Sequence, residues 1–596
     1  MDSLNTYLIP APLSALLTFV SGISIAIVSD YAGKKIFRSE DSVVRSMYFF
    51  AGLLVLSWTI WVISLLSLAT VLVFQILLWI IVGSAACLIL SRRLIPFYHF
   101  SENFNFFNKD FKSVKFYISG LLLVTLIGYV ILCLTVPTDS DSLSYHLALP
   151  VEILQKGSLW FNKDNLHFRM AGFGEMLNLL GVANGCSQLG AFIQIIALLY
   201  VLHAFLATCK AEQQLNLLVL LLGIPTLLFL LPNQKHQLTG ILCTTICFLF
   251  LLKTPTITNR TLTLFVCVML FAAGIKYSFI LSCAALILLF LLKNTPDVTL
   301  SSFFVKLIIL SAIILGPQLL FRWYYFGDPL SPLLEGFLIN PDPVILKLHT
   351  YIKNYKESAF AFPAGLLVTN SPGQISTILG AGALILGFLP FLFRFYKAEV
   401  TVIICLMAAI LVGGQISSRF FMEPLLWTIP LFVSAYSSAP YFRYFLLIPK
   451  LQIFVIVPFL LFGLYNMAPS LISDKLRHEV MIRSANGYAE SLWLNEILPA
   501  NARIATTSRS RAFLPRPYLP WEYLIFTSQN DEKQINTLRK KLAEYKITYM
   551  VLPYHGAGEL KKLYAGDLIY GPKKFPLAVR NPFNKSEYEL AVYKVK

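Results

Sequence analysis

The segment "VPTDSDSLSYHLALP", residues 136–150, places acidic and aromatic polar side chains directly after a long apolar run. Asp139 and Asp141 are two positions apart, and Tyr145 and His146 follow them closely. A carboxylate fixed where a hydrophobic helix meets water can serve as a general base towards a hydroxyl group. The segment therefore offers Asp141 and Asp139 as candidate catalytic carboxylates, one of them as the base, with Tyr145 and His146 as candidate substrate-binding residues.

Two other interpretations of the same segment stay open from the spacing alone. Asp141 or Ser142 can cap a helix that runs through residues 143–155, because Asp and Ser side chains accept hydrogen bonds from the first backbone N–H groups of a helix. The Asp139–Asp141 pair can also hold a divalent cation, although two carboxylates are a small ligand set. Whether a metal takes part is left undecided.

A third acidic residue follows in "LHFRMAGFGEML", residues 166–177. Glu175 is the last charged side chain before another apolar run, which makes it a further catalytic candidate. The alternative is a structural role, since an acid in the first turn of a helix is favoured by the helix dipole.

Cationic side chains stand beside three later apolar runs. They are Lys235 with His236 in "PNQKHQ", Lys276 in "GIKYS" and Arg419 in "QISSRFFMEP". Cations from separate helices at one level suggest a shared anion, and a phosphate on a membrane lipid fits best. The alternative is that each side chain only extends along its helix to reach water.

The elements that must position these residues are membrane helices. The chain of 596 residues is 57% hydrophobic and 13% charged, whereas soluble domains carry about 25% charged residues. The net charge of +17 comes largely from short connections between apolar runs, and no basic stripe with interleaved aromatics suggests a nucleic-acid partner. About fourteen runs are close to the ~20 residues that cross a bilayer. We expect spans near 8–29, 47–69, 71–91, 116–136, 186–208, 214–232, 237–252, 261–275, 278–292, 307–321, 376–393, 400–414, 424–439 and 451–468.

The distribution of Lys and Arg predicts the orientation, because cytoplasmic connections carry an excess of these residues. The basic connections then lie inside, and residues 137–175, 322–375 and 471–596 lie outside together with the candidate site. The connections that we assign to the cytoplasm contain Lys34, Lys35, Arg38, Arg45, Arg92, Arg93, Lys109, Lys112, Lys115, Lys253, Arg260, Lys293, Lys306, Arg394, Lys397, Arg443 and Lys450.

The composition changes to mixed polar after residue 470, which predicts a small α/β domain. Residues 502–508 and 547–553 are expected strands, and residues 532–546 have helical apolar spacing. The last segment, 588–596, is expected to be an edge strand. The predicted organisation is therefore 1–115, additional membrane helices; 116–470, the membrane core; and 471–596, the outer domain.

The order of these motifs resembles the bacterial GT-C glycosyltransferases. The resemblance covers residues 116 to 596 and rests on short motifs in a common order. They are Asp141-Ser142 with Tyr145-His146, Gly172 with Glu175, Lys276, the turn at Gly327-Asp328-Pro329, Ser418-Arg419-Phe420, and Trp493-Leu494 with Leu498-Pro499. Asp328 stands where the family pattern has Asn, and residues 1–115 precede the usual first catalytic loop.

The resemblance implies a multi-pass enzyme of the bacterial inner membrane with its site on the outer face. Such an enzyme transfers a sugar, with inversion, from a polyprenyl-phosphate-linked donor to a lipid, glycan or protein acceptor. Asp141 would be the base, and Arg419 and Lys276 would offset the charge of the leaving phosphate. Some members use a divalent metal and others do not, and the resemblance implies no other cofactor.

Two other function classes remain as alternatives. An O-antigen or polysaccharide polymerase or ligase also uses lipid-linked glycans, but relies on Arg and His rather than on an acidic loop, so the Asp139–Asp141 pair disfavours it. A lipid-linked glycan transporter or flippase would need polar residues within its spans. The predicted spans carry almost no charge, which disfavours transport.

Overall fold

The computed structural model describes residues 3–91, 114–254, 256–293, 299–338, 341–354, 360–435, 447–514, 516–527, 531–577 and 586–596. Part of the predicted cytoplasmic face falls outside these ranges, namely Arg92, Arg93, Lys109, Lys112 and Arg443. The cytoplasmic location of these basic side chains therefore stays a prediction.

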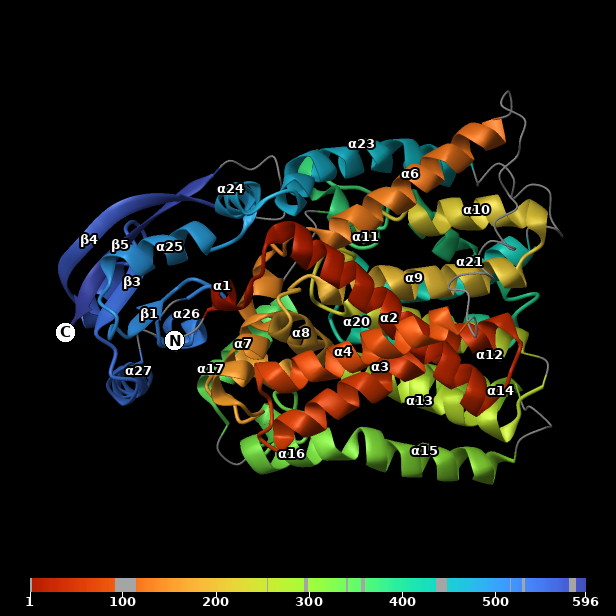
Figure 1. Cartoon of the computed structure of the whole chain (residues 1–596), viewed down its shortest axis with the longest axis horizontal. Helices are drawn as coiled ribbons and strands as arrows, with labels where there is room; N and C mark the ends of the chain where they lie inside the picture. Colours follow the sequence, from red (N-terminus) through yellow and green to blue (C-terminus); the bar gives the residue numbers. More distant parts are fainter. Residues whose placement is uncertain are drawn as a thin grey trace.

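Most of the chain forms a bundle of helices whose axes run roughly along one direction (Figure 1). One hydrophobic core joins nearly all of them. The helices before the C-terminal region are α1 Leu4–Tyr7, α2 Ala11–Phe37, α3 Ser42–Leu65, α4 Val71–Leu90, α6 Val114–Leu134, α7 Ala148–Lys156, α8 Phe173–Ala183, α9 Leu189–Thr208, α10 Ala211–Leu222, α11 Leu227–Leu230, α12 Gln237–Lys253, α13 Asn259–Ile275, α14 Ile280–Lys293, α15 Leu300–Ile314, α16 Gly316–Phe326, α17 Pro343–Asn354, α18 Ala364–Leu367, α19 Leu389–Leu392, α20 Lys397–Val412, α21 Ser418–Ala435 and α23 Leu447–Met467.

The protein is a multi-pass membrane protein. Among the described residues, six helices are long and apolar enough to cross a bilayer: α2, α3, α4, α6, α9 and α23. The bent pair α15 and α16 brings the number to seven if it counts as one span. Of these six helices α9 is the most buried, because 94% of its most apolar window is buried. Each of the predicted apolar runs coincides with one or more helices, but the number of about fourteen spans stays a prediction.

Three of the expected spans are not single regular α-helices, and one of them, 214–232, is divided between α10 and α11. Helices α15 and α16 meet at an angle of 48°, where Pro317 opens α16 and removes a backbone donor from the helix ladder. The expected span 376–393 is mainly a 3₁₀ helix, Gly380–Phe388, followed by the short α19. Gly380 has φ +68°, a conformation that interrupts a regular helix and that glycine adopts readily.

The C-terminal region has the expected α/β character. Its five strands follow the order β2-β1-β3-β5-β4, with β1, β2 and β3 parallel and β5 antiparallel to its neighbours. The strands are β1 Ile504–Thr506, β2 Tyr518–Leu519, β3 Tyr549–Pro553, β4 Ala565–Pro576 and β5 Glu587–Val595, and the helices are α24 Asp474–Ser484, α25 Tyr488–Ile497, α26 Trp521–Phe526, α27 Glu532–Glu544 and α28 Gly558–Tyr564.

The position of the last strand corrects one expectation. Strand β5 is not an edge strand, because it pairs with β3 on one side and with β4 on the other. Strand β4 takes the edge instead, and most of its residues are exposed. The sequence of β4 does not show a clean alternation of apolar and polar residues, and the apolar pattern therefore does not predict this strand.

The N-terminal segment and the C-terminal region meet at one end of the bundle (Figure 1). The backbone N–H of Leu4 donates to the carbonyl of Ala512 over 2.7 Å. The backbone N–H of Ala11 donates to Asp474 over 2.8 Å, and Arg477 donates to the carbonyl of Ile9 over 2.6 Å. Through these contacts residues 4–11 connect the C-terminal region to the membrane helices.

The loops that were predicted to share the outer face also meet at this end. Tyr325 donates to the carbonyl of Phe161 over 2.7 Å, which joins the regions 322–375 and 137–175. Asn162 contacts the Tyr545 hydroxyl over 2.6 Å, which joins the first loop to the C-terminal region. The common face is therefore found in the structure, while the limits of the three predicted segments stay predictions.

Candidate functional site

The segment 139–156 begins with a turn in which Asp139, and not Asp141 or Ser142 as in the capping alternative, makes the capping hydrogen bond. The Asp139 carboxylate accepts the Ser142 backbone N–H over 2.9 Å, and neither Asp141 nor Ser142 caps the helix with its side chain. The expected helix 143–155 is instead a π-helical turn, Ser142–His146, followed by α7. Asp139 makes the capping hydrogen bond, and the Asp141 side chain faces the cations instead.

The Asp141 carboxylate lies between two cationic side chains from distant parts of the sequence. Lys235 Nζ is 2.8 Å from Asp141 Oδ2, and Arg509 Nη2 is 3.3 Å from Asp141 Oδ1. Lys235 is nearly buried, and Asp141 keeps 17% of its side-chain surface exposed. The carboxylate is thus fixed by a buried cation on one side and remains reachable from solvent.

A buried hydrogen-bond network fixes the 232–237 loop, which carries Lys235, against the acidic segment. The Ser142 hydroxyl accepts the backbone N–H of Gln234 over 2.8 Å. The Asn178 side-chain amide donates to the carbonyls of Gln234 over 2.9 Å and of His146 over 3.1 Å. Helix α9 must come very close to these amides at Gly190, where a Cβ atom would lie 2.1 Å from Asn178 Oδ1. Asn178 and Gln234 therefore support the site, and neither was among the residues predicted for it.

Lys276 and Arg419 share the ring of Phe420. Lys276 Nζ lies 5.8 Å from the ring centroid, and the Arg419 guanidinium carbon lies 5.3 Å from it. The charges of Lys235 and Arg419 both act on Lys276, which places all three cations in one electrostatic group. Arg419 Nε has no hydrogen-bond partner among the described residues. The predicted grouping of cations at one level is thus present, and it retains free hydrogen-bonding capacity.

Tyr145 lies between the acidic and the cationic residues. Burial raises the pKa of its hydroxyl, and the charges of Asp141, Glu175, Arg419 and Arg509 all reach it. A buried neutral phenol among these charges can donate or accept a hydrogen bond without adding charge.

His146 and Glu175 form a buried pair directly behind this group. His146 Nδ1 is 2.6 Å from Glu175 Oε1, and Glu175 Oε2 accepts the Gly172 backbone N–H over 2.6 Å. His146 Nε2 has no partner within the described parts of the chain. Glu175 is thus an acid of the first helical turn, as the structural alternative held, and it also orients the imidazole of His146.

His236 does not join the cations. Its side chain is fully buried and lies 3.0 Å from Asn178 Oδ1 and 3.3 Å from the Thr239 hydroxyl. Its backbone is in the left-handed region, with φ +49°, where the 232–237 loop turns into α12. The structure therefore places His236 in the supporting network rather than on the surface of the site.

The C-terminal region is fixed against the first loop by a buried ionic cluster. His167 Nδ1 and Arg511 Nη2 each lie 2.5 Å from Glu522 Oε1. Burial alone would raise the pKa of Glu522, but the charges of Arg511 and His167 hold it down to about 2. Arg511 also donates to Asn165 over 2.7 Å. A buried acid paired in this way holds the region in a defined position next to Asp141.

The two aspartates do not fit a divalent cation as they are arranged. The Asp139 carboxylate holds a backbone N–H, and each oxygen of Asp141 faces a side-chain cation. Among the described residues, no group of three or more His, Cys, Asp or Glu side chains can hold a metal ion. A hard cation would need several oxygen ligands that are not otherwise engaged.

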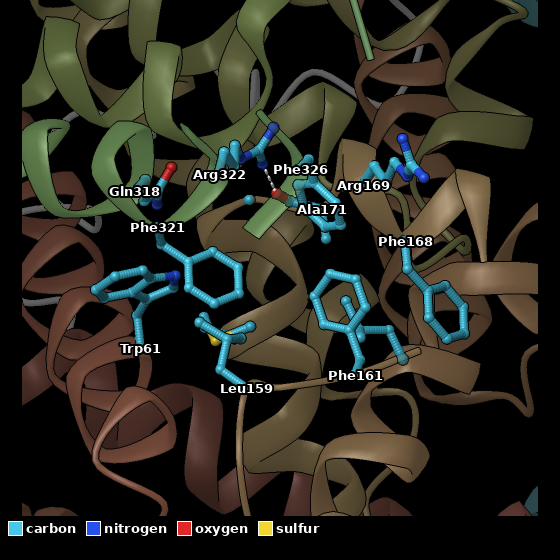
Figure 2. Close-up of a pocket in the computed structure, with 13 residues that line it drawn as sticks. Trp61, Leu159, Phe161, Phe168, Arg169, Ala171, Gln318, Phe321, Arg322 and Phe326 are labelled. Carbon is cyan, nitrogen blue, oxygen red and sulfur yellow. Dashed lines mark hydrogen bonds between the residues drawn. The ribbon is translucent and has the colours of Figure 1, made fainter. Parts of the chain in front are cut away.

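A small cavity lies beside α16, separate from the Asp141 group. Figure 2 shows its aromatic wall and the Arg322 guanidinium on the carbonyl of Ala171. About 20 Å³ is open to the centre of a water-sized sphere, enough for roughly one water molecule. Its charged lining residues are Arg169 and Arg322, and none of Asp141, Lys235, Lys276 and Arg419 lines it. Its wall includes Trp61, Phe161, Phe168, Phe321 and Phe326.

The sequence of the membrane region matches the family model described as the DUF1420 N-terminal domain over residues 90–481. The chain belongs to the DUF1420 family. The matched range includes Asp141, Glu175, Lys235, Lys276 and Arg419, and it ends before Arg509. No curated protein matches the sequence.

Two solved structures are similar to this DUF1420 protein over about four-fifths of its length. One is the crystal structure of ArnT from Cupriavidus metallidurans bound to undecaprenyl phosphate, with 12% identity, a TM-score of 0.47, and coverage of 81% of this chain and 98% of that chain. The other is the arabinofuranosyltransferase AftD from Mycobacteria, with 13% identity, a TM-score of 0.45, and coverage of 80% and 40%.

The structure brings most of the predicted site residues together and adds one that the sequence did not indicate. Asp141, Tyr145, Lys235, Lys276 and Arg419 are in one electrostatic group. The addition is Arg509, outside the DUF1420 match, in a stretch of the C-terminal region whose short strands and loops have no recognisable motif.

Proposed function

We propose that this DUF1420 protein is a membrane glycosyltransferase that moves a sugar from a polyprenyl-phosphate-linked donor to a cell-envelope acceptor. The observation that carries the proposal is the Asp141 carboxylate, reachable from solvent, next to the group of Lys235, Lys276 and Arg419. Such a group suits a reaction in which a hydroxyl loses a proton and a phosphate leaves.

In the proposed reaction, Asp141 removes the proton of the acceptor hydroxyl. The hydroxyl oxygen attacks the anomeric carbon of the donor sugar from the face opposite the phosphate, so the configuration inverts. The bond between this carbon and the phosphate oxygen breaks, and polyprenyl phosphate leaves with the electron pair. The proton ends on Asp141 and then passes to water.

The cations act on the leaving phosphate. Charge develops on the phosphate as the glycosidic bond breaks, and cations already in position lower the energy of this transition state. Arg419 can bind two phosphate oxygens with its planar guanidinium, while Lys276 adds a point charge. Phe420 supports both side chains by facing them with its ring.

The proposed location is the inner membrane of a bacterium, with the site at the outer face. The Lys and Arg distribution supports this orientation. The region 137–175, the N-terminal segment and the C-terminal region meet at one end of the bundle, as the orientation requires. The acceptor would reach the site from the same face.

The decisive experiment uses the full-length protein in lipid nanodiscs with a pool of radiolabelled polyprenyl-monophosphate sugars and an envelope lipid extract. Protein-dependent release of polyprenyl phosphate, with the label in a new product, is the expected result. Asp141→Asn is the matched inactive control. In proteoliposomes, a label that crosses the bilayer with its sugar–phosphate bond intact would identify a transporter instead.

A further inference from the structure

Arg509 differs from the other arginines of the C-terminal region in what surrounds it. Its guanidinium carbon lies 5.3 Å from the Trp521 ring centroid, and its Nη2 atom lies 3.3 Å from Asp141. Its side chain is 37% exposed, whereas that of Arg511 is 1% exposed. Arg509 Nε has no hydrogen-bond partner in the described part of the chain. Arg509 therefore contacts Asp141, and its Nε–H donor is still free among the described residues.

The backbone that carries Arg509 is fixed from two sides. The N–H groups of Arg511 and Ala512 both donate to the carbonyl of Leu143, over 3.1 and 2.9 Å. The carbonyl of Ala512 accepts the N–H of Leu4 over 2.7 Å. The acidic segment and the N-terminal segment thus hold this loop between them, and the position of Arg509 does not depend on its own ion pair.

A purely structural role explains little of this arrangement. An ion pair as exposed as that of Arg509 contributes little to stability. The docking of the C-terminal region is already secured by the buried cluster of Arg511, Glu522 and His167. An arginine fixed on an aromatic ring, with free donors beside an acid and other cations, has the geometry of an oxyanion-binding side chain.

We infer that Arg509 is a further phosphate-binding residue, supplied by the C-terminal region to the headgroup of a polyprenyl monophosphate. This inference rests on the proposed function and deepens it. In the absence of the lipid, Asp141 forms ion pairs with Arg509 and Lys235. The phosphate headgroup competes with Asp141 for these cations, so that binding of the donor releases the carboxylate for its role as base. A carboxylate held by two cations is a poor base, and this competition links donor binding to catalysis.

The test measures equilibrium binding of polyprenyl monophosphate without a sugar to the full-length protein in neutral-lipid nanodiscs. Arg509→Gln is expected to weaken binding about tenfold or more, with an unchanged melting temperature. Arg516→Gln is the matched control, because this substitution removes the same charge outside the site. Arg516 donates to Asn495 and to the carbonyl of Pro499. It is expected to bind as the wild type does.

The outcomes separate this inference from the proposed function. If Arg419→Ala loses binding while Arg509→Gln binds as the wild type does, the role of Arg509 is wrong and the phosphate site stands. If both variants bind as the wild type does, the proposed phosphate site is wrong as well. Should Arg509→Gln fail to fold, Arg509→Lys decides: a partial loss of affinity supports the inference, and wild-type affinity overturns it.

Two further arms identify the ligand and the competition. Inorganic phosphate at the concentration of the lipid is expected not to displace it, and displacement would indicate a site for free phosphate and contradict the inference. Asp141→Asn is expected to bind polyprenyl monophosphate more tightly, because the competing charge is gone. This gain should be smaller in the Arg509→Gln background, and an equal gain would show that Asp141 and the lipid do not share Arg509.

Discussion

Lys235 Nζ lies 2.8 Å from Asp141 Oδ2, while the carboxylate of Asp139, two residues earlier, accepts a hydrogen bond from the backbone N–H of Ser142. Neighbouring acids of the same type thus have different tasks, and the difference comes from what each one touches. One holds the start of a turn, and the other stands among cations where a reacting hydroxyl can reach it.

Asp141→Asn is expected to lower turnover about 10²–10⁴-fold, the usual cost of removing a positioned base. Asn keeps the size of the side chain but cannot accept the proton. The measurement is the rate of polyprenyl phosphate release at saturating donor, with the membrane abundance of each variant checked first.

Asp139→Asn is the internal control for that experiment. Asn still accepts a hydrogen bond at the start of a helix, so the turn at Ser142 should persist and activity should change little. Wild-type turnover in Asp141→Asn together with an inactive Asp139→Asn would reverse the two assignments.

Arg419→Ala is expected to weaken donor binding about tenfold or more, because a hydrogen bond to a charged group contributes about 1.5–3 kcal/mol. Arg419→Lys should recover only part of the affinity, since an ammonium group lacks the planar pair of donors. Titration of the donor against both variants checks this, and unchanged affinity in Arg419→Ala would rule out the contact.

Glu175→Ala is expected to destabilise the protein as well as to lower activity. The change leaves the His146 imidazole and the Gly172 N–H without their buried partner, at about 1–3 kcal/mol for each unsatisfied group. The melting temperature in detergent measures the loss. Glu175→Gln can still bond to both groups, so a melting temperature as low as that of Glu175→Ala would contradict this explanation.

Stability should depend on pH through Glu490, a buried acid of α25. Burial raises the pKa of Glu490 to about 7, although hydrogen bonds from Tyr588, Ser508 and Thr506 act in the opposite direction. Because the folded state binds this proton more tightly, its contribution to stability is full below about pH 4.5 and is lost as the pH rises through 7.

The size of this effect is at most about 3–4 kcal/mol, because the pKa of Glu490 rises from 4.5 to about 7 and one pKa unit corresponds to about 1.4 kcal/mol. Melting temperatures measured between pH 5 and 8.5 should fall with rising pH in the wild type and fall less in Glu490→Gln. Glu496→Gln, at an exposed position of the same helix, is the matched control. Equal pH dependence in all three proteins would exclude Glu490 as the source.

Reporter fusions test the orientation. A reporter inserted at Gly157 and one placed after Lys596 should both report the outer side, since the loop and the C-terminal region meet at one end of the bundle. A reporter at Lys35, in the first basic connection, should report the cytoplasm. A cytoplasmic signal from Gly157 or Lys596 would invert the whole orientation.

The sequence by itself indicated a membrane protein with several spanning helices, and it showed which acids and cations stand at the ends of the apolar runs. Apolar runs of nearly spanning length form helices almost wherever they occur, because a backbone in lipid must satisfy its own hydrogen bonds. The placement of Lys and Arg between the runs predicts that Asp141, Lys235, Lys276 and Arg419 share one face, and the outer location of that face stays a prediction.

Only the tertiary structure decided how these pieces meet. Arg509 is 368 residues away from Asp141 along the chain, and no local pattern can indicate such a contact. Likewise β5 is an inner strand because β4 pairs outside it, and Asp139 rather than Asp141 is the cap, while Asp141 pairs with the buried Lys235. Local spacing sets helices and candidate side chains, whereas partners depend on the packing of segments that are distant in sequence.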